Sequence, residues 1–324
     1  MLLAGTADGL YRITGLDDMG ETTTEVALDA GAVMRIRSFD AFEGVFAATE
    51  TGLYYAADGA ENGWTNLGVP REKVYAVGAG PDGRLYAGTR PAHLYVAETA
   101  DRTGLDDELE WRELDAFQDL PSRDDWRLPR HENLAQVRDV HVPSGASERV
   151  VAGVEVGGVH VSDDGGETWT ERRDVVHDDI HELHVIGPEE FVAATGFGLF
   201  RTTDAGRSWT RLDEGYDQRY FRSVFAVDGA IYTGSALAHT ATWDEADADP
   251  ELFVSRAGES LEPVAHPRSD ETVTGITAIG GAPVAATHHG TVLRGQDGDW
   301  TVAESLPVTD DFAGSYTPLL WVEN

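Results

Sequence analysis

Three arginines have the side chain and the setting needed to bind an anion. Arg130 ends a stretch rich in Pro, Trp and Arg, and Arg219 and Arg222 flank an aromatic pair. A guanidinium group binds a carboxylate or a phosphate through two parallel hydrogen bonds. We therefore expect Arg130, Arg219 and Arg222 to bind a small anionic or polar molecule.

Carboxylates, a histidine and a tyrosine in the same part of the chain could act on such a molecule. Glu155 precedes a Val-Gly-Gly turn, and Asp179 stands two residues before His181. Positioned carboxylates and imidazoles act as general acids and bases. Tyr220 lies between two of the arginines and would serve as a nucleophile or as an apolar wall. The expected catalytic residues are Glu155, Asp179, His181 and Tyr220.

Two tryptophans would complete the walls of the site. Trp126 lies between Pro121 and Pro129, and Trp243 lies in an insertion from Ala236 to Pro250. Ligand sites are lined mainly by apolar and aromatic side chains. We expect Trp126 to line the site and Trp243 to cover it as a lid. On this hypothesis, replacing Trp243 with Ala weakens ligand binding without lowering thermal stability.

A divalent metal ion is a second possible ligand. His181, His288 and His289, with the carboxylates of Glu155 and Asp179, offer the nitrogen and oxygen ligands that such ions take. Adjacent histidines in a strand often point to opposite sides, which argues against His288 and His289 binding the same ion. The candidate metal ligands are therefore His181, His288 and His289. Whether the protein binds a divalent ion is left open.

Two copies of one eight-residue pattern indicate which elements position these residues. Residues 162–169 read SDDGGETW, and residues 202–209 read TTDAGRSW. An Asp carboxylate caps backbone N–H groups, Gly permits positive φ, and Trp covers the turn from the next strand. The residues expected to stabilise these turns are Asp164, Gly166, Trp169, Asp204, Gly206 and Trp209.

This pattern resembles the Asp-box (BNR) repeats of β-propellers. Families that carry the repeat include sialidases, the sortilin ectodomain and photosystem II stability/assembly factor-like proteins. The resemblance implies an all-β fold of four-stranded antiparallel blades. The stretches 121–129, 155–158, 179–181 and 219–222 resemble a sialidase-like or photosystem II assembly factor-like subfamily.

Strand signals predict seven blades in a single β-propeller domain, residues 1–324. The second strands of the blades are expected at 2–6, 45–49, 84–89, 150–154, 191–195, 230–235 and 283–287. The third strands are expected at 9–12, 52–55, 93–96, 158–161, 198–201, 251–255 and 290–294. The segment Pro318 to Val322 would pair with the first strand and close the propeller. Six blades with one atypical hairpin is the alternative.

The order of strands places the turns on two faces. Successive strands run antiparallel, so the Asp-box turns share one face, and the connections that carry the candidate site residues share the other. We therefore expect the site at the mouth of the central channel.

Composition limits the setting and the partners. The chain has 58 Asp and Glu residues against 24 Lys and Arg, a net charge of −34, and Lys73 as its single lysine. Such acidity is typical of adaptation to high salt, where charge is screened over about 3 Å. It predicts a halophilic source and excludes binding of nucleic acid, whose phosphates would be repelled.

The sequence contains no pattern typical of a targeting segment, a disulfide or a thiolate site. The sequence has no cysteine, hence no disulfide and no thiolate site. It shows neither a signal peptide nor a long apolar span, so we expect a cytoplasmic protein that does not enter a membrane.

The leading hypothesis is a site that binds, or also hydrolyses, a small anionic or polar ligand, and three other interpretations bear on it. The resemblance to sialidases implies an arginine triad, a Tyr nucleophile assisted by Glu, and a separate acidic residue. The resemblance to assembly factors implies a scaffold that docks a protein partner on the same rim, with Trp126, Tyr220, Phe221 and Trp243 as anchors. In the third interpretation, the arginines form only structural ion pairs in an acidic protein.

Overall fold

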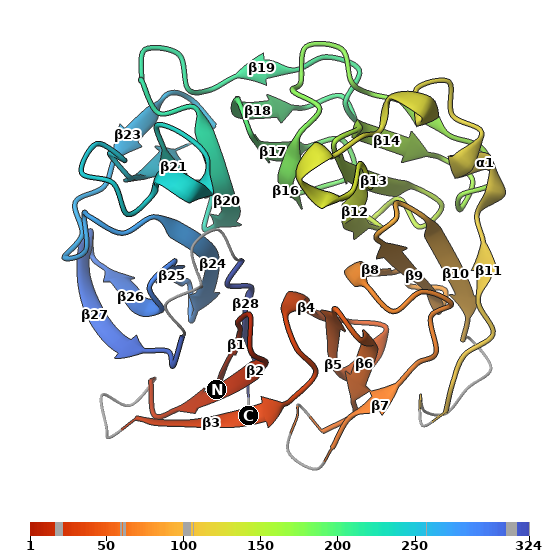
Figure 1. The fold of residues 1–324 in the computed structure, drawn as a ribbon, viewed down its shortest axis with the longest axis horizontal. Helices are drawn as coiled ribbons and strands as arrows, with labels where there is room; N and C mark the ends of the chain where they lie inside the picture. Colours follow the sequence, from red (N-terminus) through yellow and green to blue (C-terminus); the bar gives the residue numbers. More distant parts are fainter. Residues whose placement is uncertain are drawn as a thin grey trace. The chain divides into compact units, whose positions relative to one another are not determined.

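The structure is a computed structural model, and it describes residues 1–16, 22–58, 60, 63–99, 105, 107–256, 258–308 and 316–323. Its strands form seven four-stranded antiparallel sheets (Figure 1). This confirms the predicted seven-bladed β-propeller. The six-bladed alternative is wrong.

Each sheet is built from strands that are close in sequence. The strands of the first four sheets are β1 Leu2–Gly5, β2 Leu10–Thr14, β3 Thr23–Leu28, β4 Val33–Phe39, β5 Phe42–Thr49, β6 Gly52–Ala56, β7 Thr65–Asn66, β8 Val74–Ala79, β9 Arg84–Thr89, β10 Leu94–Glu98, β11 Arg112–Glu113, β12 Gln136–His141, β13 Val150–Glu155, β14 Gly158–Ser162 and β15 Thr170–Glu171. The remaining strands are β16 Ile180–Val185, β17 Phe191–Thr195, β18 Gly198–Thr202, β19 Thr210–Arg211, β20 Tyr220–Val227, β21 Ala230–Ala236, β22 Glu251–Arg256, β23 Leu261–Pro263, β24 Val273–Ile279, β25 Ala282–Thr287, β26 Thr291–Gln296, β27 Asp299–Ser305 and β28 Leu319–Trp321.

All fourteen predicted second and third strands overlap strands of the structure. Their signal is strong because these strands are the interior of each sheet. Every residue of β13 and β17 is buried, so both strands read as short runs of Val and Ala bounded by turn residues. The short outer strands, such as β15 and β19, have no such run.

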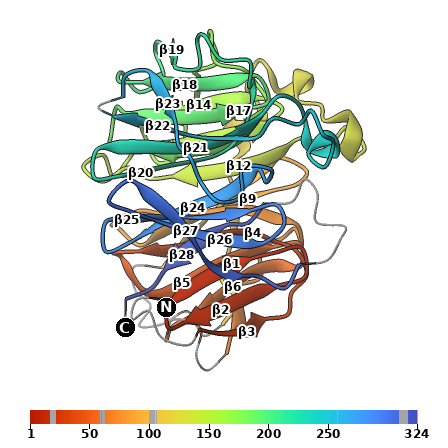
Figure 2. The same ribbon diagram turned by 90° about the vertical axis from the view of Figure 1, so that its left-hand side faces the viewer.

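The two ends of the chain meet in one sheet. β28 pairs with β1 in antiparallel register, with Leu3 opposite Leu320, in a sheet of order β28-β1-β2-β3 (Figure 1, Figure 2). The amino group of Met1 donates to the carbonyl of Val322 at 2.7 Å. The predicted completion of the first blade by the C-terminal strand is therefore confirmed.

The two eight-residue turns have the same hydrogen bonds. Asp164 Oδ1 accepts from the backbone N–H of Thr168 at 2.8 Å, and Asp204 Oδ1 accepts from that of Ser208 at 2.8 Å. Hydrogen bonds from Ser208 lower the pKa of Asp204 to about 2. The Asp carboxylates thus tie the two ends of each turn together.

Glycine and tryptophan complete both turns. Gly166 and Gly206 have φ of +100° and +79°, values that other residues rarely adopt. Trp169 Nε1 donates to the carbonyl of Gly166, and Trp209 Nε1 donates to that of Arg172, both at 3.0 Å. The Trp169 indole is therefore held by its own turn, whereas the Trp209 indole is held by the segment that follows β15.

Two compact units can be distinguished. One comprises Met1–Ile36, Ala194–Phe200 and Arg211–Asn324, and the other comprises Arg37–Ala193 and Arg201–Thr210. In the first, Leu2, Ile13 and Leu319 share a core. In the second, Phe117, Trp126 and Val150 share another. That residues 1–324 form a single domain remains a prediction.

Helical segments are few and short. They are α1 Asp115–Gln118, η1 Arg123–Asp125, η2 Pro129–His131 and η3 Thr240–Thr242. In the described part of the chain, no helix is long and apolar enough to cross a membrane. Three of the four lie in the connection between β11 and β12, which carries Trp126 and Arg130.

Candidate functional site

Glu155 is a buried carboxylate at the end of β13. Its side chain is 2% exposed, and it lies opposite Gln136 at the start of β12. Gln136 Nε2 donates to Glu155 Oε2 at 2.7 Å, and Arg138 Nε lies 3.6 Å from the same oxygen. Arg130, at the end of the inserted connection, donates to Glu155 Oε1. Two arginines and an amide therefore compensate the cost of burying this charge.

Asp179 and His181 extend the same group of charges. Asp179 precedes β16 and His181 lies within it, and Asp179 Oδ2 is 3.5 Å from His181 Nε2. Arg130 Nη2 is 3.9 Å from Asp179 Oδ1, so Arg130 contacts both carboxylates. Burial alone would raise the pKa of Asp179, but His181 and Arg130 outweigh it and lower the pKa. Asp179 therefore carries its charge at neutral pH.

These contacts unite four of the expected site residues. Arg130, Glu155, Asp179 and His181 come from three separate segments of one unit, and they form one network. We call them, with Gln136 and Arg138, the Glu155 cluster. His181 has no exposed surface. It therefore orients Asp179 rather than meeting a ligand directly.

A pocket of about 590 Å³ opens beside the Glu155 cluster. Its lining residues are Pro70, Arg71, Glu72, Lys73, Arg90, Pro91, Arg130, His131, Glu132 and Leu134. Arg90 Nη1 lies 3.4 Å from Gln136 Oε1, which joins the pocket wall to the cluster. We call this site the Arg130 pocket.

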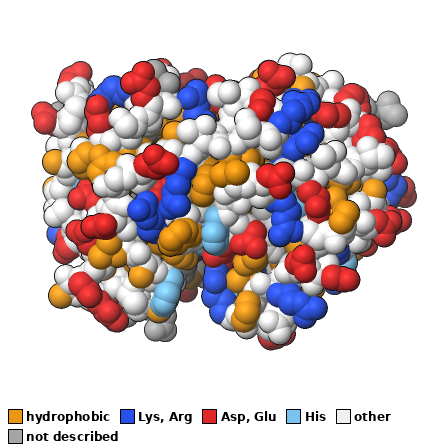
Figure 3. All heavy atoms as spheres, turned by 90° about the horizontal axis from the view of Figure 1, so that it is seen from above, with side chains coloured by type: hydrophobic (Ala, Val, Ile, Leu, Met, Phe, Trp, Pro, Cys, Tyr) orange, Lys and Arg blue, Asp and Glu red, His pale blue; other side chains and the backbone are white. Residues whose placement is uncertain are grey.

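The lining of the Arg130 pocket is unusually basic. Four of its ten residues are Lys or Arg, against 24 of 324 in the whole chain. Elsewhere acidic side chains are frequent, as on the face drawn in Figure 3. Burial, and then the positive charge of Arg90, lower the pKa of His131. The four basic residues outnumber the two acidic ones, Glu72 and Glu132, so the lining has a positive balance in a strongly acidic protein.

Sequence reasoning missed most of this lining. Arg71, Lys73 and Arg90 come from two connections far from Arg130 in sequence, and no motif marks them. One signal was present, since Lys73 is the single lysine.

Arg219 and Arg222 take part in separate contacts. Arg219 Nη1 lies 2.7 Å from Asp213 Oδ2, and Asp213 is fully buried. Arg222 is 4% exposed, donates to Tyr316 Oη at 2.7 Å and stacks over the same ring. Both arginines thus take part in internal contacts and lie apart from the Glu155 cluster, and ligand binding by them stays a prediction.

The expected aromatic walls are part of the core. Trp126, Tyr220 and Trp243 are 3%, 7% and 2% exposed. Trp126 Nε1 donates to Ser122 Oγ at 3.0 Å, and its ring packs on those of Phe117 and His160. These residues therefore do not line a ligand site, and Tyr220 is not exposed as a nucleophile.

The lid expected at Trp243 is also corrected. Its indole packs edge-on against Tyr220, with ring centroids 6.1 Å apart, and its Nε1 donates to the carbonyl of Ala238 at 3.1 Å. Replacing Trp243 with Ala would therefore lower stability, contrary to the lid hypothesis.

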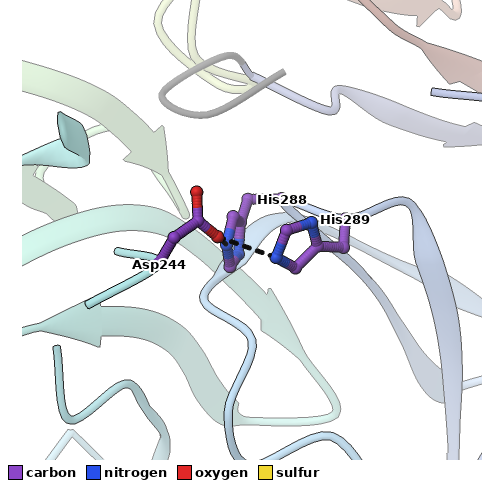
Figure 4. Close-up of side chains that lie close together, drawn as sticks. All are labelled: Asp244, His288 and His289. Carbon is purple, nitrogen blue, oxygen red and sulfur yellow. Dashed lines mark hydrogen bonds and ion pairs between the residues drawn. The ribbon is translucent and has the colours of Figure 1, made fainter. Parts of the chain in front are cut away.

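His288 and His289 form a different group with Asp244. Asp244 Oδ1 is 3.4 Å from His288 Nε2 and 2.9 Å from His289 Nε2 (Figure 4). His181 belongs instead to the Glu155 cluster. The three candidate metal ligands are thus divided between two groups.

Each group brings three possible ligand atoms within 4.8 Å of one another, so a bound divalent ion stays a prediction. The backbone N–H of Thr272 donates to His288 Nδ1 at 2.9 Å. Burial, and then His289, lower the pKa of His288. The backbone thus occupies Nδ1 of His288, and its Nε2 lies toward Asp244. In the Glu155 cluster, Arg130 and Arg138 already neutralise the carboxylates.

Comparisons with solved structures show the fold. A GH74 enzyme of Niastella koreensis matches with a TM-score of 0.61 and 14% identity, over 83% of this chain and 45% of the enzyme. This chain therefore spans less than half of that enzyme. YCF48, in a structure bound to D1 peptide, matches with a TM-score of 0.58 and 15% identity, over 83% of this chain and 81% of YCF48. The WD40 β-propeller domain of Doa1 matches with a TM-score of 0.58 and 12% identity, over 85% and 83%.

The likeness is one of fold alone. The sequence matches no protein-family model and no curated protein. Enzymes and peptide-bound propellers both occur among these neighbours. The choice between those functions must therefore be made from the residues of this chain.

Proposed function

We propose that this protein binds a small anionic ligand in the Arg130 pocket. The observation that carries the proposal is the concentration of basic side chains there, in a chain with a net charge of −34. Glu72 and Glu132 in the lining, with Glu155 and Asp179 beside Arg130, offset part of this positive charge. An anionic ligand would pair with the basic side chains that remain accessible in the pocket.

Arg130 is the residue best placed to recognise the ligand. Its side chain lines the pocket and is 50% exposed, and its guanidinium donates to the buried Glu155. Asp179 lies close to the same guanidinium and limits its movement. A guanidinium fixed in this way loses little entropy when it binds a carboxylate or phosphate.

Binding is better supported than catalysis. The Asp179–His181 pair could exchange a proton, but His181 has no exposed surface. The buried Tyr220 and the internal contacts of Arg219 and Arg222 do not supply the groups of sialidase chemistry. We therefore assign the Glu155 cluster a positioning role.

The docking hypothesis has less support from this chain. A peptide-bound propeller is among its structural neighbours. However, the four proposed aromatic anchors, which are Trp126, Tyr220, Phe221 and Trp243, are at most 7% exposed. Anchors of a protein interface must reach the partner. A small ligand in a pocket is therefore the preferred function.

Substitution of Arg130 by Ala tests the proposal. We expect citrate, pyrophosphate or inorganic phosphate to raise the melting temperature of the parent protein. Loss of one charge-assisted contact of about 1.5–3 kcal/mol should weaken that binding by about 10- to 100-fold. The measurement is a thermal-shift titration at low and at molar KCl, since screening should weaken binding.

Arg112→Ala is the matched control. Arg112 is exposed and pairs with the exposed Glu167 at 2.9 Å, so its loss changes net charge equally without touching the pocket. It should bind anions like the parent. Equal binding by the parent and Arg130→Ala would refute the proposal.

A further inference from the structure

The chain's only lysine lies in the wall of the Arg130 pocket. Lys73 immediately precedes β8 and is exposed. The chain otherwise uses arginine for every basic position. Lysine differs from arginine in offering a compact point charge on a flexible stem. A single lysine in this pocket therefore suggests a contact that an arginine would not make equally well.

Lys73 also differs from most arginines of the molecule in its surroundings. Arg84, Arg149 and Arg201 each form an ion pair with a carboxylate. Among the described residues, no carboxylate forms an ion pair with Lys73. Its ammonium group is consequently available to a molecule in the pocket.

The segment that carries Lys73 is held in place. The backbone N–H of Arg90 donates to the carbonyl of Lys73 at 3.0 Å, and Arg71 Nε donates to Tyr95 Oη at 3.2 Å. The segment from Pro70 to Lys73 is thus fixed against Arg90 and Tyr95. Its side chains face the pocket from a stable wall.

The positive charges lie on separate segments of the lining. Arg71 and Lys73 belong to the connection before β8, whereas Arg130 belongs to the connection before β12. The segment from Arg71 to Lys73 carries two basic residues and one acidic residue, Glu72, so an anion bound only at Arg130 leaves a positive charge on it. A volume of about 590 Å³ is within the usual range for small-molecule sites and has room for a larger molecule.

We infer that the ligand carries at least two anionic groups, carboxylate or phosphate, and that Lys73 binds one of them while Arg130 binds the other. This inference rests on the proposed function. Arg90 contributes further positive charge to the same pocket. Lys73 is then the residue that distinguishes a ligand with two anionic groups from a simple anion.

The single lysine allows a direct chemical test. An amine-acetylating reagent can modify Lys73 and the amino group of Met1, and mass spectrometry of peptides gives the rate at each. The probes are pyrophosphate, citrate and acetate, compared at constant ionic strength with KCl. Met1 serves as the internal control because it lies outside the pocket lining.

We expect pyrophosphate or citrate at saturation to slow acetylation of Lys73 at least tenfold, without changing the rate at Met1. Acetate should have little effect. Protection by pyrophosphate alone identifies a phosphate ligand, and protection by citrate alone identifies a carboxylate ligand. In calorimetry, Lys73→Ala should bind the protecting anion at least tenfold more weakly, and Lys73→Arg should bind it with intermediate affinity.

Two results would overturn the inference. If the anions bind in an Arg130-dependent manner but leave Lys73 equally reactive, Lys73 is not a ligand contact, and the proposed function stands. If no probe binds and none protects, both the inference and the proposed function fail.

Discussion

A chain that ends at Gly314 is expected to be strongly destabilised or unable to fold. This truncation removes β28, whose residues pair with Leu2, Leu3 and Ala4. Leu2, Leu3 and Ala4 have no exposed surface in the intact chain. Removal of β28 exposes them and leaves a sheet edge unpaired. The measurement is urea unfolding followed by tryptophan fluorescence, and residues 309–315, which include the new end, lie outside the described part of the chain.

Two further samples separate the effect of the strand from that of a shorter chain. Removal of only residues 323 and 324, which follow β28, should leave stability unchanged. A synthetic peptide of residues 315–324, added to the truncated chain, should restore part of the lost stability. If the chain that ends at Gly314 unfolds at the same urea concentration as the full chain, the pairing of β28 contributes nothing and this account of the first blade is wrong.

Trp126→Ala is expected to destabilise the protein by about 3–5 kcal/mol, the usual cost of removing a large buried aromatic side chain. Trp126 is 3% exposed and packs against Phe117, with ring centroids 5.1 Å apart. It also packs against His160 at 4.9 Å. The change leaves a cavity in the core that supports the connection carrying Arg130. The measurement is the change in free energy of unfolding in urea.

Trp126→Phe provides the matched control. It keeps an aromatic ring but loses the hydrogen bond from Nε1 to Ser122 Oγ, so a smaller loss of stability is expected. Its affinity for anions should equal that of the parent protein. A Trp126→Ala variant as stable as the parent would show that Trp126 is not a core residue, and a Trp126→Phe variant with weakened binding would return it to the ligand site.

The strands were predictable because their signals are local. Turn residues bound short apolar runs such as β13 and β17, and this pattern needs no knowledge of distant contacts. The pairing of β28 with β1 was also predictable, because an apolar segment remained at the C-terminus and the first blade lacked a strand. Both inferences depend on burial and pairing rules that hold for any sheet.

The site was only partly predictable because it depends on tertiary packing. Arg130, Glu155 and Asp179 were identified as polar residues in connections, and the structure brings them together. From sequence alone, Trp126 and Trp243 fit the wall of a ligand site as well as they fit the hydrophobic core. Only the packing of Trp126 on Phe117, and of Trp243 on Tyr220, shows that both belong to the core.

The roles of the arginines also depend on tertiary packing. A sequence gives no means of telling an arginine that binds a ligand from one that binds an internal acid. Arg219 is held by the buried Asp213, whereas Arg130 is half exposed at a pocket. Only the folded structure shows that Asp213 and Glu155 are buried and which arginine each of them contacts. Arg71 and Arg90 were missed for the same reason.

The most direct test of the anion site is diffraction from crystals that contain selenate, an anion whose anomalous scattering reveals its position. The account predicts an anomalous peak in the Arg130 pocket, within hydrogen-bonding distance of Arg130, Arg90 or Lys73, and its loss in crystals of Arg130→Ala. Selenate bound only at other sites, with the Arg130 pocket empty at the same concentration, would contradict the central claim.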